Sequence, residues 1–237
     1  MPVPGGEMTA RPLQFFWIAD CSGSMAGSKI QSLNTAIREA IPQMRDVAQQ
    51  NPNAQVYVRA LKFSSGAQWH ISQPTEIEKF QWKDLSAGGV TDMGKALTMV
   101  ADQLKMPPME ARGLPPVLVL ITDGYPTDDV NRGIKAIMDQ PWGKKSVRIA
   151  IGIGADADYN MLQRFIGNSE IAPLRADNAQ DLVNFIKWAS TAVLQSASAP
   201  AVSNSGNGGN SGSGPALPTI PAPPPPTGNQ SPSGDVW

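Results

Sequence analysis

The residues whose types and spacing could perform chemistry lie in three short segments of the chain. Asp20, Ser22 and Ser24 occupy alternate positions directly after an apolar run. Thr91 follows a glycine-containing loop, and Asp123 follows a second apolar run. Carboxylate and hydroxyl oxygens are hard ligands, which suit Mg²⁺, Mn²⁺ or Ca²⁺ better than zinc. These side chains therefore form a candidate site for a divalent cation.

The balance of charge in this set predicts which further ligand a bound cation would favour. Two carboxylates give two negative charges, and the three hydroxyls add none. A divalent cation held in this way stays electron-poor and favours another anionic ligand. The set therefore predicts a cation whose coordination a carboxylate from another molecule can complete.

The candidate residues follow segments that we expect to be buried strands. Residues 13–19, 116–122 and 147–153 are apolar on both faces, which is typical of central strands in a parallel sheet. Amphipathic helical patterns alternate with these strands, and this order predicts a mostly parallel sheet with helices on both faces. In open sheets of this kind, ligands bind at the carboxyl ends of the strands. The three segments can therefore meet at one edge.

Other patterns complete the expected fold. Residues 54–63 and 67–71 flank a Ser-Ser-Gly turn and predict an antiparallel hairpin at one edge of the sheet. Pro42 lies inside the first helical pattern and predicts a kink or a break there. A last short strand is expected over 171–174, and a closing helix over 181–194.

Composition divides the chain into an N-terminal extension over 1–11, one globular domain over 12–195 and a tail over 196–237. The tail is rich in Gly, Ser, Asn and Pro, and we expect it to be disordered.

The net charge of −1 does not favour nucleic acid or an anionic membrane as a partner. Cys21 and His70 are the single cysteine and histidine, which excludes a Cys/His metal cluster. We find neither a signal-peptide pattern nor a bilayer-spanning run, and therefore expect a cytoplasmic protein.

The three segments together resemble a known motif. Asp20-x-Ser22-x-Ser24, then Thr91 after Gly88-Gly89-Val90, then Asp123 before Gly124, is similar to the metal-ion-dependent adhesion site of von Willebrand factor A domains. The resemblance covers residues 12–195. It implies a Rossmann-like α/β fold whose central, mostly parallel sheet has one antiparallel edge strand and helices on both faces. Within the family, the chain is most similar to TerY-type proteins of bacterial tellurium-resistance and stress gene clusters.

The resemblance also implies roles for the five residues. Ser22, Ser24 and Thr91 would contact the metal through their hydroxyls, and Asp20 and Asp123 would act directly or through water. Mg²⁺ is the expected ion, with Mn²⁺ or Ca²⁺ as alternatives. The implied function is metal-mediated protein binding, in which a Glu or Asp of the partner completes the coordination. TerY-type proteins are associated with a serine/threonine kinase and a PP2C-type phosphatase, which suggests partners of these kinds.

Simpler interpretations apply to several of the polar residues. A lone Asp-x-Ser-x-Ser segment is more often a helix cap than a metal site, so the metal prediction depends on all three segments. Asp92, Asp128 and Asp129 are predicted to be acids at helix starts, with Thr127 as a cap, and not ligands. Cys21 is predicted to pack beneath its loop without a functional role.

Enzyme functions find less support in the sequence. Gly152-x-Gly154-x-x-Ala157 loosely matches a dinucleotide fingerprint, but it lies late in the chain and lacks the usual βαβ context. Neither Ser22 nor Ser24 stands in a G-x-S-x-G motif. We therefore predict a non-enzymatic interaction domain. The alternatives are a scaffold that acts through its Pro-rich tail and, with less support, a nucleotide-binding or hydrolytic enzyme.

Overall fold

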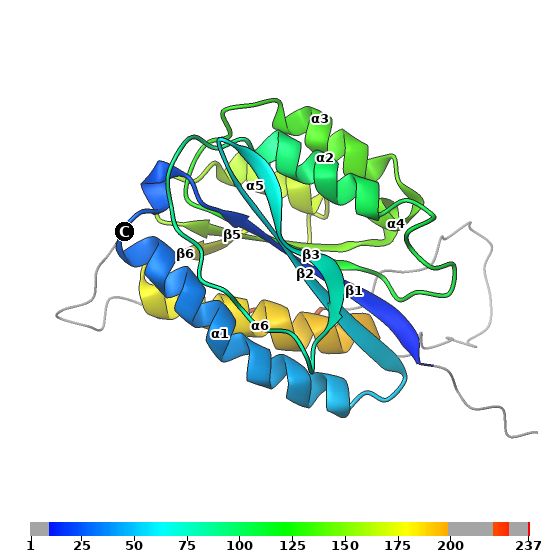
Figure 1. Ribbon diagram of the computed structural model, residues 1–237. Coiled ribbons are helices and arrows are strands. Elements are labelled where there is room, and N and C mark those ends of the chain that lie inside the picture. Colours follow the sequence, from blue (N-terminus) through cyan, green and yellow to red (C-terminus); the bar gives the residue numbers. More distant parts are fainter. Residues whose placement is uncertain (1–9, 199–219, 228–236) are drawn as a thin grey trace, which may run out of the picture.

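Six strands form one sheet in the order β3-β2-β1-β4-β5-β6, as the computed structural model shows (Figure 1). The structure describes residues 10–198, 220–227 and 237. The strands are β1 (Arg11–Asp20), β2 (Ala54–Ser64), β3 (Gly66–Glu76), β4 (Val117–Thr122), β5 (Val147–Ile153) and β6 (Leu174–Ala176). β2 and β3 pair antiparallel at one edge, and all other neighbours are parallel. The predicted fold class is confirmed.

Helices cover both faces of this sheet (Figure 1). They are α1 (Ser28–Gln49), α2 (Met93–Gln103), α3 (Val130–Met138), α4 (Pro141–Lys145), α5 (Tyr159–Ile166) and α6 (Ala179–Ser198), with a short 3₁₀ turn, η1 (Gly23–Met25), before α1. α1 and α6 pack together on one face, and α2 and α3 pack together on the other. The two layers follow from the strand–helix alternation, since each helix crosses back over the sheet.

β1 forms the centre of two separate cores because its side chains alternate between the faces. Leu13, Phe15 and Trp17 belong to the core beneath α1 and α6. Phe16 and Ile18 belong to the core beneath α2, α3 and α5. All five side chains are at most 1% exposed. This double burial explains why the sequence of β1 is apolar at consecutive positions.

The first helix runs without a break through Pro42, contrary to the sequence expectation. Its buried face includes Ile37, Ile41 and Met44, which pack into the core on either side of the proline. Proline removes one helical hydrogen bond, but packing of an amphipathic face supplies most of the stability of a helix in a folded protein. Tertiary packing therefore keeps α1 continuous.

The strand order reverses direction between β1 and β4. From β1 the chain goes to β2 and β3 on one side, and it then returns to build β4, β5 and β6 on the other. In open α/β sheets, the usual position of ligands is outside the carboxyl ends of the strands at such a reversal. Asp20 ends β1 and Thr122 ends β4, so both lie at this position.

The boundaries near the C-terminal end differ from those expected. β6 begins at Leu174, and α6 continues to Ser198, three residues beyond the predicted limit of 195. Of the predicted extension and tail, residues 1–9, 199–219 and 228–236 lie outside the described residues. Residues 220–227 and 237 are described and contact the domain. No helix in the described part of the chain is long and apolar enough to cross a membrane.

Candidate metal centre

Asp20 occupies the deepest position of the candidate site and is completely buried. Its Oδ1 accepts the backbone N–H of Ser22 at 2.7 Å, and its Oδ2 accepts the hydroxyl of Thr122 at 2.5 Å. Burial raises the pKa of Asp20 above its ordinary value, while the hydrogen bonds from Thr122 and Ser22 act in the opposite direction. A buried carboxylate of this kind gains from a nearby cation.

A continuous line of oxygen atoms leads from this loop to Asp123. The Oγ atoms of Ser22 and Ser24 lie 3.0 Å apart, and the Ser24 hydroxyl donates to Oδ1 of Asp123 at 2.7 Å. Ser22 and Asp123 are at most 2% exposed, whereas Ser24 between them is exposed, so the line reaches the surface at Ser24. The structure thus brings together Asp20, Ser22, Ser24 and Asp123.

The loop that carries Thr91 is bound to the first loop through the backbone. Gly88 donates to the carbonyl of Cys21 at 2.8 Å, and Gly23 donates to the carbonyl of Gly89 at 2.9 Å. Gly89 has a φ of +88°, and a Cβ there would lie 2.5 Å from Ser65 Oγ, so this close approach needs a glycine. Thr91 itself is 6% exposed. In the described part of the chain, its hydroxyl makes no hydrogen bond to the other four candidates.

Two residues beside the site were not identified from the sequence. The Nζ of Lys29 lies 2.7 Å from Oδ2 of Asp123, and Thr122 donates to Asp20. Thr122 could have been noticed because it directly precedes Asp123 at the end of a strand. Lys29 gave no comparable signal, since its role depends on how the first turn of α1 lies against β4.

The acids predicted at helix starts have more specific roles than expected. Asp128 accepts the backbone N–H groups of Gly94 and Lys95 and therefore caps α2, a helix distant in sequence. Asp129 caps α3, the role that the sequence suggested for Thr127. Asp92 accepts the N–H of Gly66, the hydroxyl of Thr127 and the ammonium of Lys95. These contacts agree with the prediction that the three acids are structural.

The other candidates for chemistry lie in structural positions. Cys21 is 2% exposed, and burial, together with the charge of Asp20, raises the pKa of its thiol to about 12. His70 lies on edge strand β3, with Nε2 2.7 Å from the carbonyl of Lys83. In the glycine segment after β5, the Tyr159 hydroxyl donates to the carbonyl of Gly154 at 2.7 Å. Gly152, within β5, is needed because a Cβ would lie 2.7 Å from the ring of Tyr159.

The donor set fits a hard divalent cation. The described residues contain no group of three or more His, Cys, Asp or Glu side chains that could hold a metal, so any site here depends on hydroxyl oxygens. In octahedral coordination at about 2.1 Å, neighbouring oxygens lie about 3 Å apart. The 3.0 Å separation of Ser22 Oγ and Ser24 Oγ matches that spacing.

Comparisons with known proteins agree with this geometry. The family model of the von Willebrand factor type A domain matches residues 16–188. No functionally curated protein matches the chain. A von Willebrand factor type A structure from Catenulispora acidiphila is 17% identical over 79% of this chain and 43% of its own, with a TM-score of 0.60. VWA2, an ArnB paralog from Sulfolobus acidocaldarius, is 17% identical over 75% of this chain and 45% of its own, with a TM-score of 0.56.

A third solved structure is described with a bound metal. Proximal thread matrix protein 1 from the mussel byssus, described with a zinc-occupied MIDAS motif, is 15% identical over 79% of this chain and 47% of its own, with a TM-score of 0.55. This chain spans less than half the length of each of the three proteins. At such identities the likeness shows the fold, and the family match over most of the chain shows the relationship. The chain belongs to the von Willebrand factor type A domain family.

Proposed function

We propose that this domain holds a divalent cation at the ends of β1 and β4 and binds a protein partner through it. The proposed ion is Mg²⁺, with Mn²⁺ or Ca²⁺ as alternatives. Its ligands would be Asp20, Ser22, Ser24, Thr91 and Asp123. The observation that carries the proposal is the line of oxygens from buried Asp20 to Asp123, which opens to the surface at Ser24.

Each residue of the line has a distinct part in this proposal. Asp20 supplies negative charge at the buried end, where its hydrogen bonds from Ser22 and Thr122 fix its orientation. Lys29 holds Oδ2 of Asp123, which leaves Oδ1 directed toward Ser24. A bound cation would supply positive charge that accepts a Glu or Asp carboxylate of the partner. Asp20 and Asp123 match the two charges of the ion, but the hydroxyls are neutral and weak donors, so the ion still favours a further carboxylate ligand.

Exposed apolar side chains beside the site support protein binding as its use. Val90 directly precedes Thr91 and is 48% exposed, and Tyr125 lies two residues after Asp123 and is 65% exposed. We call these two side chains the apolar rim. Aromatic and aliphatic anchors around a buried polar contact are typical of protein interfaces. The only other large hydrophobic side chain of this exposure in the described ranges is Met106, beyond the end of α2.

The wider context of the proposal comes from the sequence. We propose that the domain acts without catalysing a reaction, in the cytoplasm of a bacterium, within a stress-response or tellurium-resistance system. The resemblance to TerY-type proteins supports this context and suggests a Ser/Thr kinase or a PP2C-type phosphatase as partner. The net charge of −1 supports a protein partner over nucleic acid or an anionic membrane.

Calorimetry with Mg²⁺ and Mn²⁺ tests the metal part of the proposal. Wild type should bind one ion, and Asp20→Ala should abolish measurable binding because it removes a charged ligand. Asp139→Ala is the matched control, since Asp139 is half-exposed, pairs with Lys135 and lies at the end of α3. Equal binding by wild type and Asp20→Ala would remove the metal from the proposal.

Affinity capture with and without EDTA tests the partner part. A partner held through the metal should be lost with chelator and with Asp20→Ala, and it should be retained by Asp139→Ala. Capture that persists in EDTA would instead support the alternative of a scaffold that binds through its Pro-rich tail.

The apolar rim can be tested separately from the metal. Tyr125→Ser should weaken partner capture about tenfold or more while leaving metal affinity unchanged, because truncating an interface anchor costs binding energy without touching the ligands. Met106→Ser removes an equally exposed apolar side chain away from the site and should change neither. Equal loss of capture by both variants would show that general surface hydrophobicity is responsible.

A further inference from the structure

A second buried acid, Asp181, lies in the first turn of α6 and is 2% exposed. Its backbone N–H donates to Oδ1 of Asn178 at 2.9 Å, and its Oδ2 accepts from Nδ2 of Asn178 at 2.9 Å. This pairing lets the Asn178 side chain cap the start of the helix. It accounts for one carboxylate oxygen of Asp181 and leaves the other to be explained.

The second oxygen is satisfied by a residue from the Pro-rich segment. Oδ1 of Asp181 accepts the backbone N–H of Thr227 at 2.7 Å and the Thr227 hydroxyl at 2.6 Å. Within the described ranges, no Lys, Arg or His side chain forms an ion pair with Asp181. The two donors of Thr227 therefore supply the compensation that a buried carboxylate oxygen requires.

Residue 237 makes a second anchor nearby. The indole N–H of Trp237 donates to Ser28 Oγ at 3.1 Å, and its backbone N–H donates to the carbonyl of Asp177 at 3.1 Å. Its carbonyl oxygen lies against Gly154, where a Cβ would approach to 3.3 Å. Asp177 follows β6 and Gly154 follows β5, so Trp237 lies at the carboxyl edge of the sheet, beside the start of α1 (Figure 1).

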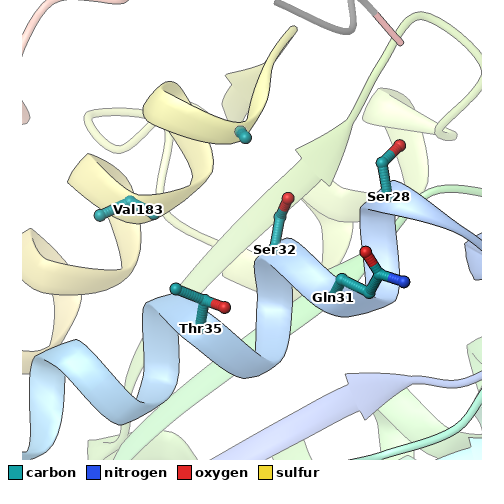
Figure 2. Close-up of a pocket in the computed structure, with 6 residues that line it drawn as sticks. Ser28, Gln31, Ser32, Thr35 and Val183 are labelled. Carbon is teal, nitrogen blue, oxygen red and sulfur yellow. The ribbon is translucent and has the colours of Figure 1, made fainter.

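Apolar contacts and a groove lie beside these anchors. The side chains of Ile220 and Trp237 are partly buried and pack against the core beneath α1 and α6. A groove of about 280 Å³ lies between these helices, lined by Ser28, Gln31, Ser32, Thr35, Ala179 and Val183. Figure 2 shows Ser28, Ser32 and Thr35 on successive turns of α1, with Val183 of α6 across the groove. Ser28 belongs both to the groove and to the Trp237 anchor.

The sequence of the segment suits this position. Residues 223–226 are four consecutive prolines, which have no backbone N–H and favour an extended polyproline conformation. Thr227 is the first residue after them that can donate from its backbone, and it donates to Asp181. Because a proline run is already extended before binding, it loses little conformational entropy when it docks.

We propose that Asp181, Asp177, Gly154 and Ser28 form a docking site for an extended, proline-rich peptide, and that its occupants are residues 220–227 and 237 of the same chain. We call it the tail seat. It is separate from the candidate metal centre, whose proposed ligands lie at the ends of β1 and β4 and before α2. The two sites nevertheless share the carboxyl edge, since Ser28 directly precedes Lys29, the partner of Asp123. The Pro-rich segment is thus held by its own domain and is not freely available to other proteins.

Fluorine NMR on the full chain tests whether the seat is occupied. All tryptophans are replaced by 5-fluorotryptophan, and Trp237→Phe assigns the resonance of residue 237. The Trp237 resonance should lie away from that of a free peptide of residues 220–237, and Asp181→Ala or Thr227→Pro should shift it to the free-peptide position. Thr191→Val is the control, since Thr191 donates only to a carbonyl within α6. A free-peptide position in wild type would overturn the proposal.

A peptide added in trans tests whether the seat is a recognition site. A full-length Thr227→Pro/Trp237→Ala variant, whose own segment is released, should bind a synthetic peptide of residues 220–237. Wild type should bind it at least about tenfold more weakly, because its own segment competes at high effective concentration. Adding Asp181→Ala to the released variant should abolish binding. Equal binding by all three proteins would overturn the proposal, and so would a Trp237 shift that depends on protein concentration, since that would indicate exchange between two copies.

Discussion

The two halves of the sheet's carboxyl edge both bury acidic side chains but compensate them differently. At the ends of β1 and β4, Asp20 and Asp123 lie within a set of hydroxyls, with one lysine beside them. Beyond β6, Asp181 accepts an amide N–H and a hydroxyl from Thr227 and a side-chain amide from Asn178. The first half has four donors for two carboxylates, namely the N–H of Ser22, two hydroxyls and one ammonium, whereas the second has three donors for one carboxylate.

The difference shows that buried acids alone do not indicate a metal site. A hydroxyl has one proton to donate and can also act as a ligand through its lone pairs, so hydroxyls around two carboxylates leave oxygen atoms that a cation can use. Backbone N–H groups can only donate, and they complete a carboxylate without any ion. Each carboxylate of the first half has two donors and that of the second has three, which agrees with the proposals of a cation at the first and a docked peptide segment at the second.

The largest expected effect is a difference in Mn²⁺ affinity between variants of Asp123 and Asp181. Asp123→Ala should lower Mn²⁺ affinity at least about 100-fold because it removes negative charge and a polar partner from the ion. Asp181→Ala should leave Mn²⁺ affinity within about twofold, since its contacts lie in the tail seat. Calorimetry on both variants gives the comparison. A large loss of affinity in Asp181→Ala would mean that the two halves are one coupled site.

Thermal unfolding in EDTA should show the larger effect for the other variant, because Asp181→Ala should lose more stability than Asp123→Ala. Asp181→Ala removes the acceptor for Thr227 and for the side-chain amide of Asn178, which should lower the free energy of unfolding by roughly 2 kcal/mol. Asp123→Ala should cost less, because it breaks the pair with Lys29 but also relieves repulsion with Asp20. If Asp123→Ala were the more destabilising variant without metal, the first half would be complete without an ion.

A smaller effect comes from the charge of Asp20. Burial raises the pKa of Asp20 above its ordinary value of 3.8, so the metal-free folded state holds the proton more tightly than the unfolded state. The stability from this proton is fully present below pH 3.8 and is lost as pH rises through the folded pKa. At pH 7, Asp20→Asn should therefore stabilise the metal-free protein by on the order of 1 kcal/mol, although it weakens metal binding.

Denaturant unfolding at several pH values checks this sign. The gain of Asp20→Asn in EDTA should shrink toward acid pH, and added Mg²⁺ should favour wild type instead. A variant that is less stable than wild type at pH 7 without metal would show that the hydrogen bonds from Ser22 and Thr122 already compensate the charge.

Much of the fold could be predicted from the sequence because local patterns determine it. The runs that form β1, β4 and β5 are apolar on both faces, and only central strands of a covered sheet require this. The hairpin of β2 and β3 was also predicted, although β3 extends further than expected. The continuity of α1 through Pro42 was not, since it depends on packing in three dimensions.

The candidate site divides in the same way. Motif order was sufficient to select Asp20, Ser22, Ser24 and Asp123, which the structure joins by hydrogen bonds. Thr91 remains a predicted ligand, with its loop held against the first one. Contacts between residues far apart in the chain leave no local pattern in the sequence and were therefore not predicted. The ion pair of Lys29 with Asp123 joins residues 94 positions apart, and the bond of Thr227 to Asp181 joins residues 46 apart.

The smallest expected effect concerns Cys21, which lies between two of the proposed ligands but belongs to the core. Its thiol packs beneath the loop with its Sγ 3.9 Å from the carbonyl of Ala19, and burial raises its pKa from 9.0 to about 12. The thiolate population at pH 8 should therefore be roughly a thousandfold below that of an ordinary cysteine. Iodoacetamide labelling, followed by mass spectrometry, should be slow in the native protein and fast in urea. Cys21→Ala should keep Mn²⁺ affinity within about twofold while costing about 1 kcal/mol of stability through the small cavity it leaves. Rapid native labelling, or a large loss of affinity, would instead make the thiol part of the metal centre.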